Sequence, residues 1–238
     1  MKKIGQQFLL LGCLFLLFSP IALAQEVTVD FSAWLELLRE DARSAGISEK
    51  TLDAALADLE APEPRVIELD QKQPEKTESL EDYVAARVSQ ERIAEGRLML
   101  QRYPTWLGRV ERKYKVQRRF IVALWGIESS YGRHTGKQPV IPALVTLAYD
   151  TRRGDYFRKE LLAALKILDE GHVSLSRMKG SWAGAMGPFQ FMPSSYRHYA
   201  VDADGDGRIN IWGSVPDALA SAANYLAKAG WKDDQTWG

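Results

Sequence analysis

The residue best suited to acid–base chemistry is Glu128, which directly follows the apolar run Phe120–Ile127. At helical spacing, Ile121, Leu124 and Trp125 share its face, so the carboxyl group is expected to point toward apolar side chains. Such surroundings disfavour the charged form and raise the pKa, as a general acid working near neutrality requires. The alternative is a salt-bridged glutamate at the end of a helix, with no catalytic role.

A second segment, residues 178–196, has the composition of a carbohydrate-binding surface. Trp182 and Phe189 offer flat faces for stacking on sugar rings. Ser181 and Gln190 add neutral hydrogen-bonding groups, which suit hydroxyl and acetamido groups, and interspersed glycines let the backbone approach a ligand. The alternative is a turn of glycine and aromatic residues that packs against a core. Together with Glu128, the segment indicates an acid facing a carbohydrate groove.

A third segment, residues 202–210, matches the first nine positions of an EF-hand calcium loop. The expected ligands are Asp202, Asp204, Asp206, the backbone carbonyl of Arg208, and Asn210. Gly213 replaces the usual glutamate at the twelfth position, and Asp217 is the nearest carboxylate beyond it. Hard oxygen ligands favour Ca²⁺, and because the flanking segments do not form two long EF-hand helices, we expect the ion to be structural. The alternative is an acidic turn that binds nothing.

Two motifs resemble the lytic murein transglycosylase B family. They are Gly-Ile-Glu-Ser-Ser-Tyr-Gly at 126–132 and Gly-Ser-Trp-Ala-Gly-Ala-Met-Gly-Pro-Phe-Gln-Phe-Met-Pro-Ser-Ser-Tyr at 180–196. Further likeness at 65–70, 82–84, 140–153 and 222–225 extends the resemblance over nearly the whole mature chain. It implies a mainly α (α+β) fold with a lysozyme-like catalytic core, an N-terminal helical region and few short strands. It also implies an enzyme that cleaves the glycan strands of bacterial peptidoglycan.

The resemblance assigns roles to particular residues. Glu128 would be the single general acid and base, cleaving the bond between N-acetylmuramic acid and N-acetylglucosamine to leave a 1,6-anhydromuramoyl end. Asp217 would complete the Ca²⁺ site. The residues expected to bind substrate are Ser181, Gln190, Tyr83, Arg152, Arg153, Tyr156, Met192 and Tyr225. The two arginines could instead be exposed charges at the start of a helix. A muramidase of lysozyme type and a non-catalytic, Ca²⁺-stabilised peptidoglycan-binding protein remain as alternatives.

The first residues have the pattern of a secretory signal. Lys2 and Lys3 precede the apolar run Phe8–Phe18, and Ala22-Leu23-Ala24 is a small-residue cleavage pattern, so residues 1–24 are predicted to be removed in export to the periplasm. The alternative is a lipobox at residues 10–13, which would make the protein an outer-membrane lipoprotein through Cys13. Cleavage after residue 24 removes the one cysteine, so no disulfide is expected.

The charge balance is close to neutral. The chain has 31 basic and 31 acidic residues; without Lys2 and Lys3 the balance is 29 to 31, a net charge of −2. This argues against a nucleic-acid partner. The three histidines have no paired spacing that would predict zinc, and no organic cofactor is expected. We expect a monomer whose partners are peptidoglycan glycan strands and possible cell-wall enzymes.

Hydrophobic periodicity divides the chain into an N-terminal helical region, 25–115, and a core, 116–238. Helices are predicted within 31–59 with a stop at Gly46, within 79–114 with a break at Tyr103, and at 119–129, 142–150, 156–170 and 215–229. Residues 66–78 are predicted to be extended. Because members of the resembled family continue beyond the equivalent of Gly238, we expect a core that is truncated at this end and a cleft that is incomplete.

Overall fold

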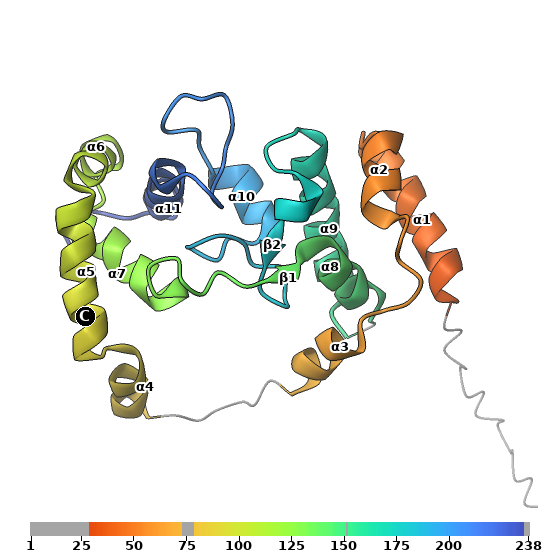
Figure 1. Ribbon diagram of the computed structural model, residues 1–238, viewed down its shortest axis with the longest axis horizontal. Coiled ribbons are helices and arrows are strands. Elements are labelled where there is room, and N and C mark those ends of the chain that lie inside the picture. Colours follow the sequence, from red (N-terminus) through yellow and green to blue (C-terminus); the bar gives the residue numbers. More distant parts are fainter. Residues whose placement is uncertain (1–28, 73–78, 151, 236–238) are drawn as a thin grey trace, which may run out of the picture.

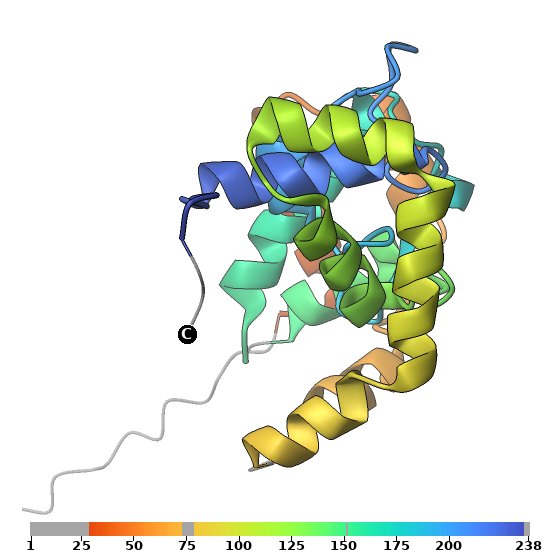
Figure 2. The ribbon, with the colours of Figure 1, turned by 90° about the vertical axis from the view of Figure 1, so that its left-hand side faces the viewer.

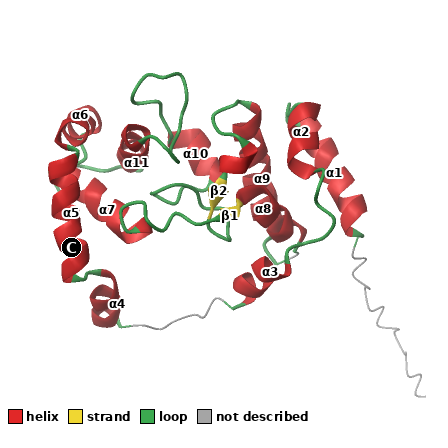
Figure 3. Ribbon diagram, viewed as in Figure 1, coloured by secondary structure: helices red, strands yellow, loops and turns green. Residues whose placement is uncertain are grey.

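The computed structural model describes residues 29–72, 79–150 and 152–235. The predicted signal peptide and Cys13 lie outside these residues. The described chain is mostly helical (Figures 1 and 3). Its elements are α1 (Phe31–Ser44), α2 (Glu49–Leu56), α3 (Pro64–Gln71), α4 (Leu80–Arg87), α5 (Gln90–Arg102), α6 (Pro104–Tyr114), α7 (Arg118–Ser129), β1 (Gln138–Pro139), α8 (Val140–Tyr149), α9 (Gly154–Asp169), η1 (Leu175–Arg177), β2 (Lys179–Gly180), α10 (Pro193–Tyr199) and α11 (Val215–Lys228).

Helices α8 and α9 form the centre of the molecule. Most of α8 is buried, and it packs along α9. Helices α2 and α3 both contact this pair, and in Figure 1 α2 lies to its right and α3 below it. At the start of α2, Ser48 and Thr51 donate hydrogen bonds to Asp169 on α9, and above all the bond from Ser48 lowers the pKa of that carboxyl to about 2. The first three helices are thus fixed to the core by polar as well as apolar contacts.

Helices α5 and α6 cover the opposite side. They pack against α7 and α11, and Figure 2 turns this side toward the viewer. In α6, Leu107 and Val110 are buried against this group, whereas α4 has no buried residue. The region predicted as 25–115 therefore packs in two parts, one on α8 and α9 and the other on α7 and α11.

A short sheet joins the core to the segment that carries Gln190. Strand β1 pairs antiparallel with β2, with Gln138 opposite Gly180, and further bridges link Gly180 to Met186 and Met186 to Phe191. Gly136, just before β1, has φ +87°, and a Cβ atom there would lie 1.9 Å from the carbonyl oxygen of Gly180. The close approach of these two backbones therefore requires glycine at position 136.

Most of the helices were predicted, with three differences. The helical segment predicted from residue 79 breaks not only at Tyr103 but also at residues 88 and 89, between α4 and α5. The predicted extended segment 66–78 is wrong in its first part, because α3 runs from Pro64 to Gln71. Proline suits the first turn of a helix, and Val66 and Asp70 bury one face of α3. Helix α10 was not predicted. The described strands are few and short, as expected, and no helix within the described residues has the length and hydropathy of a membrane span.

Candidate active site

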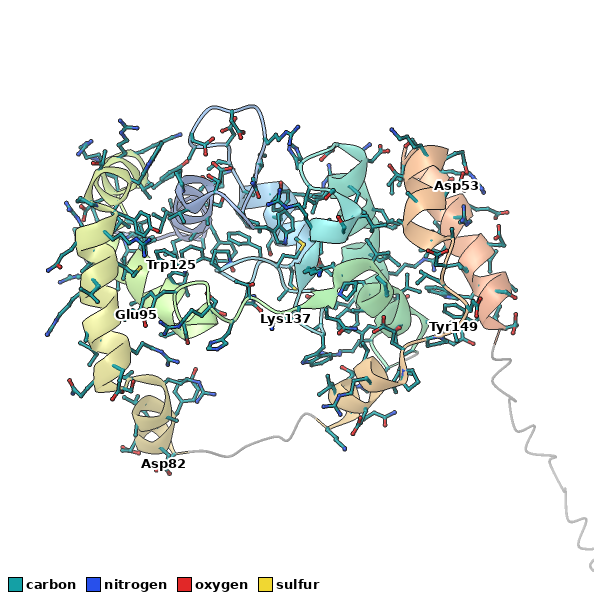
Figure 4. The ribbon with its side chains drawn as sticks, in the orientation of Figure 1. Asp53, Asp82, Glu95, Trp125, Lys137 and Tyr149 are labelled. Carbon is teal, nitrogen blue, oxygen red and sulfur yellow. The ribbon has the colours of Figure 1, made fainter. Side chains whose placement is uncertain are left out.

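Glu128 lies in the last turn of α7, whose buried face holds the helix in the core. Ile121, Val122 and Trp125 are buried, and Trp125, labelled in Figure 4, stacks on Phe189 with ring centroids 6.1 Å apart. The helix ends where Ser130 and Tyr131 adopt positive φ angles, and the N–H groups of these two residues donate to the carbonyls of residues 126 and 125. The orientation of Glu128 is therefore set by a packed and capped helix end.

Ser129 connects this helix end to the second motif. Its hydroxyl donates to the Pro188 carbonyl at 2.6 Å and accepts from the Gly132 N–H at 2.9 Å. Because Ser129 is buried, the two bonds are shielded from water. Residues 126–132 and 180–196, which the sequence analysis paired by composition, are thus joined directly beside Glu128.

Glu128 faces a cavity of about 270 Å³. The cavity lies between α7, the segment before α10, α10 itself and α11. Its lining residues are Leu124, Glu128, Phe189, Gln190, Phe191, Met192, Ser195, Ala222 and Tyr225. Four residues of the predicted site, Glu128, Gln190, Met192 and Tyr225, therefore meet at one place. Among the described residues, Glu128 supplies the one carboxylate of this lining.

The carboxyl group of Glu128 has the character expected of an acid. Desolvation by the surrounding side chains raises its pKa above the ordinary value. The residue is exposed at the mouth of the cavity, and no side chain within 29–72, 79–150 or 152–235 forms an ion pair or hydrogen bond with it. The salt-bridged alternative is therefore not seen in the described chain, and a ligand can reach the carboxyl group.

Gln190 is held in a fixed orientation. Its backbone has φ +50°, in the left-handed region, and its side-chain amide nitrogen donates to the carbonyls of Gly187 at 2.9 Å and Thr135 at 3.3 Å. Both amide hydrogens are thereby used, so the amide oxygen is the atom left to accept a bond from a ligand. Tyr225 packs edge-on against Phe191 and keeps 39% of its surface exposed.

The other predicted substrate residues lie outside this cavity. The Ser181 hydroxyl accepts the Ala185 N–H at 3.1 Å within a turn. Tyr83 is exposed on α4, where the guanidinium of Arg87 lies 4.0 Å from its ring centroid. Tyr156 is exposed on α9 and meets Phe157 edge-on. Their roles in substrate binding remain predictions.

Arg152 and Arg153 both bind the carboxylate of Asp70 on α3. Arg152 donates through Nε at 2.9 Å and also bonds the Asp70 backbone carbonyl at 2.9 Å, and Arg153 donates to the other carboxylate oxygen. Burial raises the pKa of Asp70, but the hydrogen bonds from the two arginines outweigh it and hold that pKa below the ordinary value. The two arginines are half-exposed, and in this structure they attach α3 to the start of α9.

The acidic loop, residues 202–213, brings carboxylates close to one another. Oxygens of Asp202, Asp204 and Asp217 lie within 4.8 Å of one another. Asp217 is fully buried in the first turn of α11, and its oxygens accept the N–H groups of Ala203 and Asn210, each at 2.8 Å. Burial raises the pKa of this carboxyl. Three converging carboxylates, one of them buried, form a donor set that suits Ca²⁺.

The remaining ligands predicted for the loop have other positions. Asp206 lies outside the close group, and its carboxylate accepts the N–H of Arg208 at 2.8 Å. Arg208 is exposed, and the side chain of Asn210 accepts the Gly213 N–H at 2.9 Å. Asp217, the carboxylate expected to replace the missing ligand at Gly213, lies in the close group, and its role as a metal ligand remains a prediction.

Several residues of the cavity were not predicted from the sequence. Ser195 and Ala222 line it, and Ala222 could have been found from Tyr225, since residues three apart share a helix face. A second finding is Glu160, a buried carboxylate that accepts the N–H of Ser194 at 2.8 Å and its hydroxyl at 2.7 Å. Glu160 caps the first turn of α10 and thereby positions Ser195.

Comparison with known proteins shows the family to which the chain belongs. The sequence profile described as Transglycosylase SLT domain matches residues 30–238. The chain belongs to this family. It is 41% identical over 150 residues to membrane-bound lytic murein transglycosylase B of Escherichia coli (strain K12), an alignment that covers 62% of this chain and 41% of that protein.

Solved structures of transglycosylases share the fold. SltB3 from Pseudomonas aeruginosa in complex with NAG-NAM-pentapeptide is 46% identical, with a TM-score of 0.84 over 87% of this chain and 55% of that one. Escherichia coli Slt35 in complex with calcium is 32% identical, with a TM-score of 0.75 over 84% and 64%. The chain thus spans less than two thirds of each relative. The predicted family and the mainly helical, lysozyme-like fold are confirmed.

Proposed function

We propose that this chain carries the catalytic core of a lytic transglycosylase that cleaves peptidoglycan between N-acetylmuramic acid and N-acetylglucosamine. The observation that carries the proposal is Glu128, an accessible carboxyl group with a raised pKa on a cavity beside Gln190, Met192 and Tyr225. A raised pKa keeps the carboxyl protonated at a pH where an ordinary glutamate has lost its proton, and this is the form that can act as an acid.

The proposed reaction uses this one group twice. Glu128 first donates its proton to the glycosidic oxygen, and the acetamido group of the muramoyl residue assists the departure of the leaving sugar. The resulting carboxylate then takes the proton of the C6 hydroxyl, whose oxygen closes onto C1 to give a 1,6-anhydro end. Because the nucleophile belongs to the substrate, neither a second carboxylate nor an activated water is needed.

The lining of the cavity favours this reaction over hydrolysis. Most glycosidases that hydrolyse the bond use a second carboxylate as base or nucleophile. Among the described residues, none but Glu128 contributes a carboxylate to the cavity, and the buried Glu160 has both oxygens engaged by Ser194. This arrangement supports a transglycosylase in preference to a muramidase of lysozyme type.

The substrate assignment is drawn from the relatives. SltB3, whose fold this chain shares, has been solved with NAG-NAM-pentapeptide, and we extend a ligand of this class to the present cavity. The amide oxygen of Gln190 would accept the N–H of a sugar acetamido group, and the exposed ring of Tyr225 would stack on a sugar. Ser181, Tyr83 and Tyr156 are proposed as more distant contacts along the glycan strand.

We further propose export to the periplasm through residues 1–24.

We propose a structural Ca²⁺ in the loop at 202–213. Asp202, Asp204 and Asp217 would hold the ion, with Asp206, the Arg208 carbonyl and Asn210 as further ligands. The solved complex of the relative Slt35 with calcium supports this choice of ion. The ion would offset the repulsion between the converging carboxylates and thereby fix the entry into α11, the helix that carries Tyr225.

The function is tested by comparing Glu128→Gln with the unchanged chain on purified peptidoglycan. The variant keeps the shape of the side chain but has no proton to donate, so we expect it to sediment with peptidoglycan yet release no soluble fragments. Glu40→Gln, at an exposed position on α1, serves as the matched control and is expected to release fragments at the unchanged rate. Fragment release by Glu128→Gln at the unchanged rate would overturn the assignment of the acid.

A further inference from the structure

A second cavity of about 340 Å³ lies apart from the cavity at Glu128. It is formed by the loop after α9, η1 and the acidic loop, and it has no lining residue in common with the Glu128 cavity. Its polar and aromatic lining consists of His172, Ser174, Arg177, Arg208, Asn210 and Trp212. No residue of this cavity was predicted as a substrate contact.

Two arginines give the cavity its positive charge. Arg177 and Arg208 are exposed, and within the described residues neither guanidinium group forms an ion pair or hydrogen bond. Other arginines of the chain, such as Arg158 with Asp41, do form such pairs. The lining contains no acidic side chain, and Glu170, which precedes the cavity in sequence, pairs with Arg197 at 3.3 Å. The two cations are therefore available to an anionic ligand.

His172 adds a neutral donor. The Ile209 N–H donates to its Nδ1 at 3.3 Å, so in this arrangement the ring proton resides on Nε2. The ring packs against Tyr196, with centroids 6.3 Å apart. His172 lines the same cavity as the two arginines.

Trp212 provides a fixed apolar wall. Its Nε1 donates to the Lys179 carbonyl at 2.9 Å, and its ring lies 5.7 Å from that of Tyr196. Tyr196 follows Ser195, which lines the Glu128 cavity, so α10 supports both cavities. The Trp212 ring therefore lies in the same cavity as two guanidinium groups and an imidazole. This combination suits a ligand that has a carboxylate together with an apolar or aromatic part.

We propose that this pocket binds a carboxylate of a peptide, with Arg177 and Arg208 as its cationic contacts and Trp212 against its aliphatic part. This inference rests on the proposed function, because the peptide stems of peptidoglycan would be the source of that carboxylate. A strand engaged at Glu128 would then be held through its peptide as well as its sugars, and the pocket would distinguish peptide-bearing strands from bare glycan.

The test measures binding by titration calorimetry in the Glu128→Gln background, which keeps ligands intact. The probes are a muropeptide with its stem peptide, the same disaccharide without peptide, and inorganic phosphate. Replacing both arginines, Arg177→Gln with Arg208→Gln, should weaken muropeptide binding by at least about tenfold, which corresponds to about 1.4 kcal/mol, and leave disaccharide binding unchanged. Arg112→Gln on α6 is the matched control and should change neither.

Several results would overturn the proposal. The first is that the muropeptide and the disaccharide bind the Glu128→Gln chain with equal affinity. The second is that the two arginine substitutions weaken the binding of both ligands equally, and the third is that they weaken the binding of neither. Phosphate that binds more tightly than the muropeptide would assign the pocket to phosphate instead of a carboxylate. Because Arg208 would serve the ion only through its backbone carbonyl, the Ca²⁺ dependence of the melting temperature should be unchanged in the double variant. Peptidoglycan turnover by the unsubstituted chain tests the proposed function separately.

Discussion

Asp70→Asn is predicted to destabilise the protein, because Asp70 is the common acceptor for Arg152 and Arg153. The carboxylate is 4% exposed, and the two arginine side chains are 50% and 40% exposed. Breaking a fully buried ion pair costs about 3–5 kcal/mol, whereas an exposed pair contributes about 0–1 kcal/mol. With a buried acceptor and half-exposed donors, we expect a loss of about 2 kcal/mol in the free energy of unfolding near neutrality.

The loss should depend on pH in a defined direction. The folded-state pKa of Asp70 is lowered from its ordinary value of 3.8, because the hydrogen bonds from the two arginines outweigh burial. The folded chain therefore binds fewer protons than the unfolded chain below that ordinary value, and stability is lost as the pH falls toward the folded pKa. The difference between the unchanged chain and Asp70→Asn should accordingly be largest near neutrality and shrink below about pH 4.

The assay is urea unfolding followed by circular dichroism at several pH values. Glu68→Gln is the matched control, since Glu68 lies on the same helix and pairs with Arg65 and Lys72 at the surface, and it should leave stability nearly unchanged. Combining Asp70→Asn with Arg152→Gln should cost less than the sum of the two single changes. An effect no larger than that of Glu68→Gln, or one that does not shrink in acid, would refute the reasoning.

Two further predictions concern the backbone and the metal. Gly136→Ala should lower the melting temperature more than Gly171→Ala: both glycines have positive φ, but a Cβ atom at 136 meets the Gly180 carbonyl and one at 171 meets nothing within 4 Å. Equal shifts in thermal unfolding would contradict this. Added Ca²⁺ should raise the melting temperature and Asp217→Asn should remove that rise; a rise of the same size in the variant would rule out Asp217 as a ligand.

The helices that carry the site were predictable from local patterns. The apolar run at 120–127 and the periodicity at 215–229 gave α7 and α11, because their buried faces repeat at helical spacing. Helix α10 was not predicted because it is only seven residues long and its start is capped by Glu160, whose position depends on the tertiary fold. Helix α3 was assigned as extended because its polar residues outweighed the single buried stripe of Val66 and Asp70.

The site residues were predictable where they belong to one short segment of the sequence. They were less predictable where they contact residues that are far away in the sequence. The acidic loop was predicted to be a Ca²⁺ site because its carboxylates follow the spacing of an EF-hand loop, and Gln190 was predicted to contact substrate because it belongs to a dense motif. The engagement of Arg152 with Asp70, 82 residues away, has no local signal. The carboxylate-free lining of the second cavity likewise arises from segments that meet only in the folded chain, so sequence reasoning did not identify it.

The central claim is that Glu128 directs an intramolecular attack on C1 without consuming water. The most direct test is mass spectrometry of the fragments released from purified peptidoglycan in water enriched in heavy oxygen. The account predicts muropeptides one water lighter than hydrolysis products, with no heavy oxygen incorporated, and no such products from Glu128→Gln. Products that carry one solvent oxygen at the muramoyl end would contradict it and assign the chain to hydrolysis.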